Sequence, residues 1–578
     1  MSRRRSRRRW LIAGALGLLV VGWLAAAGLT LLSARREAQA GLELLKGARD
    51  DLGATKIVRA TALVPVERAR ADFERAHDRT GSWLLAPLKV LPVVGRQIRS
   101  IDALAGSAAE VTSVGVSTMQ ASRAAIHGQQ AGGPGRVALV EKLGVIAASS
   151  NARLRTVDLG PSRALFAPLA DARNDFSTEL ARLSGALRDL GAASDGLTPM
   201  LRGPSHYLVF AANNAEMRAG SGMFLSVGVL TIENGTFSLS DMTSTADLTL
   251  PPGAVPITGD FAARWGWTHP NEEWRNLAMT PRFDASAELA VEMWKYRTGQ
   301  DVDGVLAIDP VALQSLLRAT GPVDVEGTTV TADSVLQDVF LDQYRSTGDD
   351  IANAARRERL GTIARATVDA LDRGGWDTVV LIDQLRTAAQ GRHVLAWSHD
   401  AKQERGWEGI GIDGELSDDS VLLAVLNRGG NKLDQFLHVT SRLELDPRPS
   451  GTVVTIHATL GNETPPDLPR YVAGPYPGRD YPSGTYVGIF SIDVPGSAGA
   501  VTIDDGAPLV AAGPDGPAQV VATDVSLAPG ARRELVVRFT LPPGLRRMTV
   551  EPTARVPAVE WSDPAGSWID GDEHSVTW

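Results

Sequence analysis

The residues of this sequence best suited to chemistry are arginines, and Arg218 stands in the most suggestive surroundings. It follows a strand-like run and precedes Ala219-Gly220-Ser221-Gly222. A guanidinium can hold a phosphate group through two hydrogen bonds, and small residues let successive backbone N–H groups surround an anion. This pattern predicts an anion-binding loop. The alternative is an ordinary Gly-rich turn in which Glu216 and Arg218 pair at the surface.

A second set of arginines precedes an apolar helical stripe. The stripe recurs at spacings of three and four residues: Leu360, Ile363, Ala364, Thr367, Val368 and Leu371. The same spacing, continued backwards, places Arg356 and Arg357 on the buried face. Arginine near a helix start opposes the helix dipole, so a nearby anion would explain its presence. That anion is either a bound ligand or a carboxylate from Asp349, Asp350 or Glu358.

Familiar enzyme signatures are absent or fail on geometry. The sequence holds no Walker lysine loop, no His-Glu-x-x-His helix and no Gly-x-Ser-x-Gly turn. Ser398-His399-Asp400 has the residue types of a catalytic triad, but neighbours on a strand point to opposite faces. Residues 409–414 match Gly-x-Gly-x-x-Gly, yet a polar acidic stretch follows where a dinucleotide site needs a helix. Asp309, just before Pro310, is predicted to cap a helix rather than to bind a ligand.

The composition excludes several classes of site and partner. The 578 residues include no cysteine, which rules out disulfides, iron–sulfur clusters, thiolate nucleophiles and Cys-ligated zinc. Eight arginines and no acid stand before residue 37, so residues 37–578 carry 50 basic and 67 acidic groups, a net charge of −17. A region this acidic repels phosphate backbones, and we expect no nucleic-acid partner.

A long uncharged segment near the N-terminus predicts a membrane anchor. Trp10 to Leu32 are 23 consecutive uncharged residues, which at about 1.5 Å per residue cross a hydrocarbon core of roughly 30 Å. Six arginines precede this segment and two follow it, so the positive-inside rule keeps residues 1–9 in the cytoplasm and exports the rest. We therefore expect a single-pass transmembrane helix at residues 10–33. The alternative is a signal peptide cleaved near Ala25-Ala26-Ala27.

Residues 34–201 show a helical pattern throughout. An a/d seam, typical of helices that pack lengthwise, runs through Phe176, Leu180, Leu183, Leu187 and Leu190. We expect an extracytoplasmic helical bundle or stalk. Within it, the apolar run from Ser82 to Gly95 is broken by Pro87 and Pro92 and is too short to span a bilayer. It predicts a buried corner between helices, with contact to the membrane interface as the alternative.

Beyond residue 201 the pattern changes twice. Residues 202–430 alternate strand and helix signals, with a hairpin at Asn234-Gly235, a strand at Gly304–Ile308 and a helix at Val311–Ala319. Residues 431–578 show short alternating strands between Pro/Gly turns, which predicts a β-sandwich. The expected protein is multi-domain: a transmembrane helix, a helical bundle, an α/β domain and a C-terminal β-sandwich.

Three stretches of residues 202–430 resemble a known family. They are Tyr207 to Arg218 (YLVFAANNAEMR), Asp303 to Pro310 (DGVLAIDP) and Thr320 to Val323 (TGPV). They resemble the domain of unknown function 4012 family, and the resemblance covers about residues 40–450. It implies a membrane-anchored, exported protein of a kind found largely in actinobacteria, and it supplies no activity.

A more distant resemblance is to the LytR-CpsA-Psr phosphotransferases. It is carried by Gly304 to Val325, by Arg345 to Asp349 together with Arg356 and Arg359, and by Phe237 to Asp241. The resemblance implies an exported α/β domain that attaches glycopolymers to the cell wall from polyprenyl-pyrophosphate carriers. In that family arginines hold the pyrophosphate and aspartates hold a divalent cation.

Two positions depart from the phosphotransferase pattern. Ala219-Gly220-Ser221 stands where that family has Ser-Asp-Thr, so one metal-binding carboxylate is missing, and Ser240 stands where an arginine is expected. Asp241 remains as a ligand for Mg2+, which is usually held by one or two carboxylates together with substrate phosphates.

Two functions follow as expectations. The favoured one is a binding or scaffolding protein of the cell envelope with a degenerate phosphotransferase-like α/β domain. The other is Mg2+-dependent transfer of a glycopolymer from a polyprenyl-pyrophosphate carrier to the cell wall. The expected anion-binding residues are Arg218, Arg345, Arg356, Arg357 and Arg359, and the expected metal ligand is Asp241. The expected partners are the membrane, through Trp10–Leu32, and either a polyprenyl-pyrophosphate glycan or another envelope protein.

Overall fold

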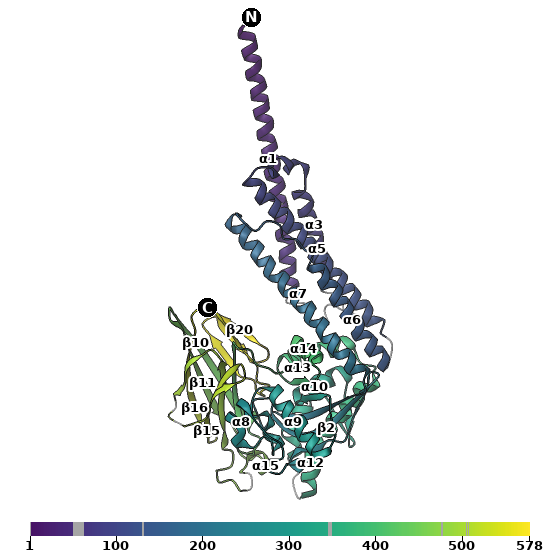
Figure 1. Cartoon of the computed structure of the whole chain (residues 1–578), viewed down its shortest axis with the longest axis vertical. Coiled ribbons are helices and arrows are strands. Elements are labelled where there is room, and N and C mark those ends of the chain that lie inside the picture. Colours follow the sequence, from purple (N-terminus) through teal and green to yellow (C-terminus); the bar gives the residue numbers. More distant parts are fainter. Residues whose placement is uncertain are drawn as a thin grey trace. The chain divides into compact units, whose positions relative to one another are not determined.

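The computed structural model describes residues 2–49, 63–129, 132–344, 350–475, 478–504, 506 and 508–578, without the side chains of residues 2–20, 48–49 and 350–358. The chain forms two compact units (Figure 1). One consists of Met1–Gln129 and Leu139–Ser194, and the other of Gln130–Ala138 and Asp195–Trp578. The first is helical, and the second combines a central α/β region with C-terminal β-sheets. The expected multi-domain organisation is confirmed in this outline.

The first unit is built from long helices that run alongside one another (Figure 1). Phe73 on α3 packs with Ala108 on α5 and Phe176 on α7, and Arg79 Nε donates to Glu37 Oε2 on α1 at 2.7 Å. The helices of this part of the chain are α1 (Ser2–Arg49), α3 (Leu63–Thr80), η1 (Trp83–Leu85), α4 (Ala86–Lys89), α5 (Val94–His127), α6 (Gly133–Leu154) and α7 (Ala167–Arg202).

The heptad seam predicted on α7 is confirmed only in part. Leu187 is buried, but Leu183 and Leu190 are 39% and 56% exposed. Ser184 Oγ, three residues before Leu187, donates to Asn151 Oδ1 on α6 at 2.5 Å. Leu180 and Leu187 pack with Ala147 and Leu154 on α6, so the face of α7 that meets α6 includes part of the predicted seam together with Ser184.

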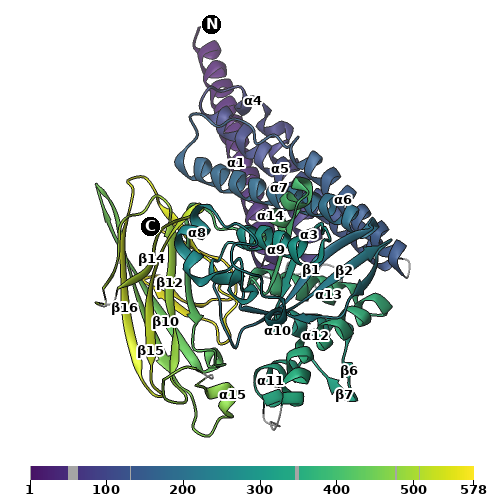
Figure 2. The same ribbon diagram turned by 60° about the horizontal axis from the view of Figure 1, so that its bottom comes forward.

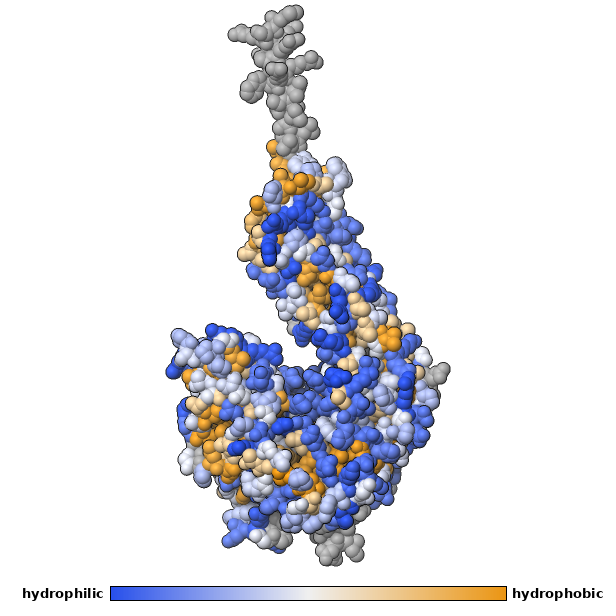
Figure 3. All heavy atoms as spheres, in the orientation of Figure 1, coloured by the Kyte–Doolittle hydropathy of each residue, from blue (hydrophilic) through white to orange (hydrophobic). Residues whose placement is uncertain are grey.

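The corner from Ser82 to Gly95 is not buried as predicted. Leu85 is buried against Ala27 on α1 and Ile98 on α5, but the neighbouring Trp83 and Val90 are 78% and 82% exposed. Figure 3 shows hydrophobic surface (orange) at the upper end of this bundle. Leu85 and the partly buried Leu88 therefore anchor the corner, while Trp83 and Val90 are exposed.

The N-terminal helix α1 contains the segment predicted to cross the bilayer. Up to residue 20, that segment lies outside the described side chains. Within the described part of the chain, no helix has the length and apolar character needed to cross a membrane. The Trp10–Leu32 anchor stays a prediction.

The second unit is organised around a mixed sheet of six strands in the order β3-β2-β1-β5-β8, with β4 beside β2. Only β1 and β5 run parallel; the other pairs are antiparallel. The predicted hairpin is confirmed, because Asn234 and Gly235 take the positive φ angles of 50° and 71° that a tight β2–β3 turn requires. The strands are β1 (Ser205–Asn213), β2 (Met223–Glu233), β3 (Thr236–Leu239), β4 (Thr243–Ser244), β5 (Gly304–Ile308) and β8 (Val394–Ser398).

Helices cover both faces of this sheet (Figure 2). Phe210 on β1 stacks on Phe224 at a centroid distance of 4.5 Å and lies 6.0 Å from Trp274, on the face that α9 covers. The helix α12 packs against β2 and β3. Asp309 caps α10 as predicted, because its Oδ1 accepts from the N–H groups of Val311 and Ala312 at 2.9 Å.

The remaining elements of this region are η2 (Thr245–Leu248), α8 (Gly259–Trp265), η3 (Gly266–Thr268), η4 (Trp274–Met279), α9 (Phe283–Thr298), α10 (Pro310–Thr320), β6 (Val323–Val325), β7 (Thr328–Val330), α11 (Val335–Phe340), η5 (Asp342–Tyr344), α12 (Asp350–Arg373), α13 (Thr378–Gln390) and α14 (Ala401–Ile410). The strands β6 and β7 form a separate two-stranded sheet.

Two six-stranded sheets close the chain, in the orders β13-β16-β11-β10-β18-β19 and β14-β15-β12-β9-β17-β20. They share one apolar core that includes Phe490 from one sheet and Phe539 from the other. The bounds are β9 (Ser420–Asn427), η6 (Asp434–Phe436), β10 (Leu437–Arg448), β11 (Gly451–Asn462), α15 (Arg470–Ala473), β12 (Tyr486–Pro495), β13 (Gly499–Asp504), β14 (Leu509–Asp515), β15 (Ala518–Leu527), β16 (Arg532–Leu541), β17 (Arg547–Val550), β18 (Glu560–Asp563), β19 (Gly566–Ile569) and β20 (His574–Thr577).

The strand β9 is buried on both faces. Leu423 and Val425 face the core between the two C-terminal sheets, while Leu422 and Leu426 join the core of the α/β region. A strand covered on both sides needs a continuous apolar run, which residues 421–426 (VLLAVL) supply. This strand begins ten residues before the expected boundary at 430/431 and binds the C-terminal sheets to the α/β region.

Candidate anion-binding site

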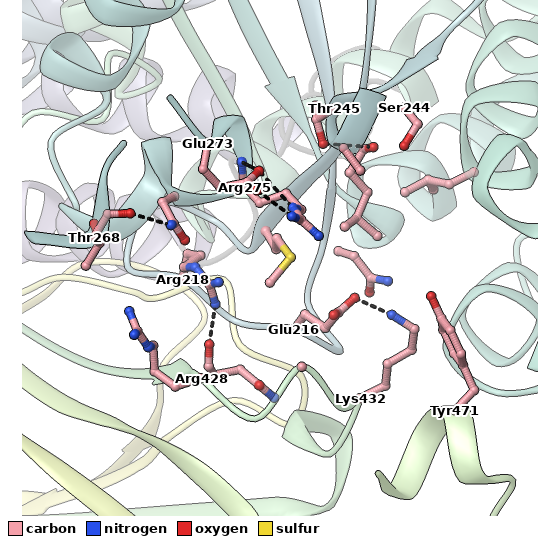
Figure 4. A pocket seen from close by; sticks show the side chains of 18 of the residues that line it. Glu216, Arg218, Ser244, Thr245, Thr268, Glu273, Arg275, Arg428, Lys432 and Tyr471 are labelled. Atoms are coloured by element: carbon pink, nitrogen blue, oxygen red, sulfur yellow. Dashed lines mark hydrogen bonds and ion pairs between the residues drawn. The ribbon is translucent and has the colours of Figure 1, made fainter. Parts of the chain in front are cut away.

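A pocket of about 470 Å3 lies in the second unit, between the α/β region and the first turns of the C-terminal sheets (Figure 4). Its charged and aromatic lining residues are Glu216, Arg218, Trp267, His269, Glu273, Arg275, Tyr344, Arg428, Lys432, Tyr471 and Arg479. Arginine and lysine outnumber carboxylates in this lining by five to two. The pocket is therefore positively charged within a protein whose net charge is negative.

The loop after β1 positions Arg218. The Met217 N–H donates to the buried Asp434 carboxylate at 3.0 Å, and the Gly220 N–H donates to the Ala278 carbonyl at 3.1 Å. These bonds fix the loop on both sides of Arg218. They also engage N–H groups that the sequence predicted would surround an anion, so the recognition of a ligand falls to side chains.

Arg218 is buried and has no acidic partner. Its Nη1 donates to the Asn427 and Met217 carbonyls at 2.5 and 3.0 Å, and its Nε is buried without a hydrogen-bond partner. No carboxylate of a described residue lies within 4.0 Å of this guanidinium. Burial lowers the pKa of Arg218 to about 10, although the nearby Glu216 carboxylate acts to raise it. The predicted surface pair between Glu216 and Arg218 is wrong, because Glu216 pairs with Lys432 instead.

Two further guanidinium groups line the same pocket. Arg428 lies over the Trp267 ring, with its central carbon 4.9 Å from the ring centroid. Burial lowers the pKa of Arg428, and the positive charge of Arg479 lowers it further. Neither arginine has a described carboxylate within 4.0 Å. Like charges raise one another's energy when they are gathered at one place, so this arrangement favours a bound anion.

Both carboxylates of the pocket are already paired (Figure 4). Glu216 and Lys432 form a buried ion pair, and the Lys432 ammonium lies 5.1 Å from the ring centroid of Tyr344. Burial lowers the pKa of Lys432, but the Glu216 carboxylate and the Tyr344 and Tyr471 side chains together raise it by more, so the net shift is upward. Glu273 Oε1 accepts from Arg275 Nε at 2.8 Å. The charges of these two ion pairs cancel, so the net positive charge of the pocket comes from Arg218, Arg428 and Arg479.

The chemistry of the donor set suits a phosphate group. A guanidinium offers a planar fork of N–H donors that matches two phosphate oxygens, and Arg218 has a buried Nε–H free to donate. The volume is in the range of small-molecule pockets, roughly 300–1,000 Å3. The site can bind and orient an anionic group.

The middle of the chain matches a known family. Residues 202–344 match the family described as Protein of unknown function (DUF4012). A comparison with curated proteins gives no match. The DUF4012 match runs from the end of α7 to the end of η5 and includes Arg218, Glu273, Arg275 and Tyr344. Arg428, Lys432 and Arg479 lie beyond it, so the pocket is shared between the DUF4012 region and the C-terminal sheets.

The other predicted ligand residues do not all gather at this pocket. Arg345 lies outside the described residues, as do the side chains of Arg356 and Arg357. Arg359 is satisfied within the protein, because its Nε and Nη2 donate to Asp338 Oδ2 at 3.0 and 2.7 Å. Of the five predicted arginines, Arg218 is the one that the described structure places in the pocket lining.

Asp241, the predicted metal ligand, lies at the surface after β3. Its side chain is 91% exposed and forms an ion pair with Arg365, and it is not among the residues that line the pocket. The described residues hold no group of three or more His, Asp or Glu side chains placed to bind a metal ion. Mg2+ takes oxygen ligands, and the two carboxylates of the pocket are committed to cations, so the pocket residues do not fit a Mg2+ site. The role of Asp241 stays a prediction.

Arg428 and Arg479 escaped the sequence analysis. Arg428 directly follows the last residue of β9, Asn427, and precedes Gly429 and Gly430. Arg218 likewise follows a strand-like run and precedes small residues. The sequence around Arg428 therefore carries the same signal as the sequence around Arg218. Arg479 stands in a Pro/Gly-rich stretch with no pattern of its own, and only the folded chain brings it to the pocket.

Proposed function

We propose that this protein is a membrane-anchored, extracytoplasmic protein of the cell envelope that binds a phosphate-bearing ligand in the pocket of its second unit. The observation that carries the proposal is the buried Arg218, which has no carboxylate partner and shares its pocket with Arg428 and Arg479. The membrane anchor rests on the uncharged Trp10–Leu32 segment and its flanking arginines.

The energetic argument concerns an unpaired buried cation. Removing a charge from water is costly unless another charge and hydrogen bonds compensate it. Two backbone carbonyls satisfy part of the Arg218 guanidinium, and its Nε–H remains without an acceptor. A bound anion supplies both the missing charge and the missing acceptor. Binding of an anion therefore stabilises the buried Arg218 guanidinium.

A lipid-linked pyrophosphate is the ligand class that we propose, on the distant resemblance to the LytR-CpsA-Psr phosphotransferases. Two phosphates carry enough negative charge to engage three guanidinium groups at once. The resemblance alone names the polyprenyl carrier and its glycan; the pocket supports the phosphate part. An anchor at residues 10–33 would tether the protein to the membrane in which such carriers reside.

Binding without turnover is favoured over phosphoryl transfer. Transfer requires positioning and charge neutralisation, usually with a divalent cation on the phosphates. The pocket carboxylates Glu216 and Glu273 are paired with Lys432 and Arg275, and Asp241 is paired with Arg365 at the surface. The Mg2+-dependent transfer of glycopolymer remains the competing function, and the experiment below distinguishes it from binding alone.

The test is calorimetric titration of the full-length protein in lipid nanodiscs with inorganic pyrophosphate, with and without Mg2+. We expect Arg428→Ala and Arg479→Ala each to weaken binding about 10-fold or more, since a hydrogen bond to a charged group contributes ~1.5–3 kcal/mol. The matched control is Arg442→Ala, which removes an exposed arginine already paired with Glu444.

Two outcomes decide the matter. Equal pyrophosphate affinity in the wild type, both pocket variants and the control would remove the binding function. Release of polyprenyl monophosphate from a polyprenyl-pyrophosphate glycan in the presence of a cell-wall acceptor hydroxyl, dependent on Mg2+ and abolished by Arg428→Ala, would establish transfer in place of binding alone.

A further inference from the structure

An apolar surface lies at one end of the first unit, at the corner between α3 and α5. It consists of the exposed side chains of Trp83, Val90, Leu91, Val93 and Val94, which we call the corner patch. Their exposed fractions range from 44% to 82%. Exposed large apolar side chains are common singly, but a contiguous group within twelve residues marks a contact surface.

The corner patch adjoins the second half of the segment predicted to cross the bilayer. Trp23 Nε1 on α1 donates to the Leu84 carbonyl at 3.0 Å, and Ala27 packs against Leu85. These contacts stand nine and five residues before Leu32, where the uncharged run ends. At 1.5 Å per residue they lie about 14 and 8 Å inside that end.

The helix α1 also has exposed apolar side chains at the level of the corner. Val21, Leu24, Leu29 and Leu32 are 48% to 66% exposed on the helix that the corner contacts. Because the corner contacts α1 at Trp23 and Ala27, it lies in the same environment as that part of α1. If α1 lies in a bilayer, the corner lies in its outer leaflet.

The charges beside the corner patch suit a phospholipid surface. Between Asp78 and Asp102 the chain has four cations, Arg79, Lys89, Arg96 and Arg99, and no acid. Arg79 and Lys89 are paired with carboxylates, whereas Arg96 and Arg99 have no described carboxylate within 4.0 Å. Tryptophan next to basic residues is the combination enriched at membrane interfaces, where head-group phosphates accept from the cations.

We propose that the corner patch inserts into the outer leaflet of the membrane as a second contact beside α1. Trp83 and the valines then lie in the acyl region and Arg96 and Arg99 meet lipid phosphates. Two contacts fix the direction in which the bundle leaves the membrane, which a single helix cannot do. This inference rests on the membrane anchoring proposed above.

The experiment uses the absence of cysteine from the chain, because one introduced cysteine carries one label. Val90→Cys places an environment-sensitive fluorophore in the corner patch. The control is Val145→Cys on α6, also an exposed valine of the first unit. Ser150 on α6 meets Thr118 on α5 at 2.6 Å. Thr118 stands 24 residues beyond Val94, so this contact with α6 lies about 36 Å along α5 from the corner.

The full-length variants are reconstituted into nanodiscs that hold one copy each and into vesicles for flotation. Quenching is measured with spin-labelled phospholipids and with aqueous iodide. We expect the Val90 probe to be quenched several-fold more by the lipid quencher than the Val145 probe, and the order to reverse with iodide.

Three results would overturn the inference, and they differ. Flotation with vesicles while iodide quenches both probes alike would remove the corner contact and leave the α1 anchor intact. Shielding of the Val90 probe in crowded vesicles but not in single-copy nanodiscs would assign the patch to a second copy of the chain. Failure of the protein to float would remove the anchor and the corner contact together.

Discussion

Two buried arginines in the second unit differ in the groups that they contact. Arg555 is fully buried and meets Asp434 Oδ1 at 3.1 Å, with further bonds to the Asp434 and Leu437 carbonyls. Arg218 is buried to nearly the same extent but meets only backbone carbonyls. The first is satisfied by the protein itself. The second has no carboxylate of a described residue within 4.0 Å and would meet the proposed anionic ligand.

Replacement of Arg218 tests this distinction. Arg218→Met keeps the length of the side chain and removes a buried charge without a partner, so we expect the free energy of unfolding to fall by less than about 1 kcal/mol or to rise. Pyrophosphate binding should be lost. Guanidinium chloride unfolding and calorimetric titration measure the two effects. A loss of several kcal/mol would show that Arg218 is a structural residue.

Arg555→Met is the counterpart. It leaves the Asp434 carboxylate buried without its cation, and breaking a buried pair from one side costs about 3–5 kcal/mol. Burial already raises the pKa of Asp434 despite Arg555, so the loss should be smaller at the more acidic pH, where the carboxyl of the variant takes up a proton more readily. Unfolding curves at pH 4.5 and 7.5 check this. Equal losses at both pH values would contradict it.

At the scale of elements, the sequence predicts those whose signals are local. The strand at Gly304–Ile308, the helix after Asp309 and the turn at Asn234-Gly235 form as expected, because capping and turn chemistry act within a few residues. The corner at Ser82–Gly95 is largely exposed and the seam on α7 forms only in part, because exposure depends on which other helix packs alongside. Prediction of the pocket needs local sequence signals as well as tertiary structure. The loop sequence around Arg218 indicates an anion site, whereas Arg479 reaches the pocket only through tertiary structure.

The loop that carries Arg218 depends on one glycine. Gly222 has a φ of +90°, and a Cβ there would lie 2.8 Å from the Asn213 carbonyl oxygen. We expect Gly222→Ala to lower the free energy of unfolding by about 1–2 kcal/mol and to weaken pyrophosphate binding through displacement of Arg218. Gly253→Ala is a control for the positive φ alone, because its Cβ would meet nothing within 4 Å. Equal effects of both variants on binding would contradict a positioning role.

At the scale of the whole molecule, buried carboxyls govern the response to pH. Burial raises the pKa of Glu404, Glu551 and Asp570 to about 7, from ordinary values of 4.5, 4.5 and 3.8. The folded chain therefore holds protons that the unfolded chain releases between about pH 4 and pH 7. A raised folded pKa gives stability that is complete below the unfolded pKa and is lost as the pH rises through 7.

We accordingly expect the second unit to be less stable at pH 8 than at pH 5. The double variant Glu551→Gln with Asp570→Asn should reduce this difference, because neither replacement can lose a proton. Asp446→Asn, at an exposed carboxylate paired with Arg448, serves as the control. Urea unfolding at the two pH values measures the effect. An undiminished difference in the double variant would contradict the assignment.

The contact between Arg555 and Asp434 also bears on the order in which the chain folds. Asp434 anchors the Met217 N–H beside Arg218, while Arg555 stands 121 residues further along the chain. Met217 gains its acceptor on Asp434, and Asp434 gains its partner Arg555, only when three distant parts of the chain have come together. Contacts between distant parts of a chain form slowly because they close long loops, so the loop that carries Arg218 is expected to order late in folding.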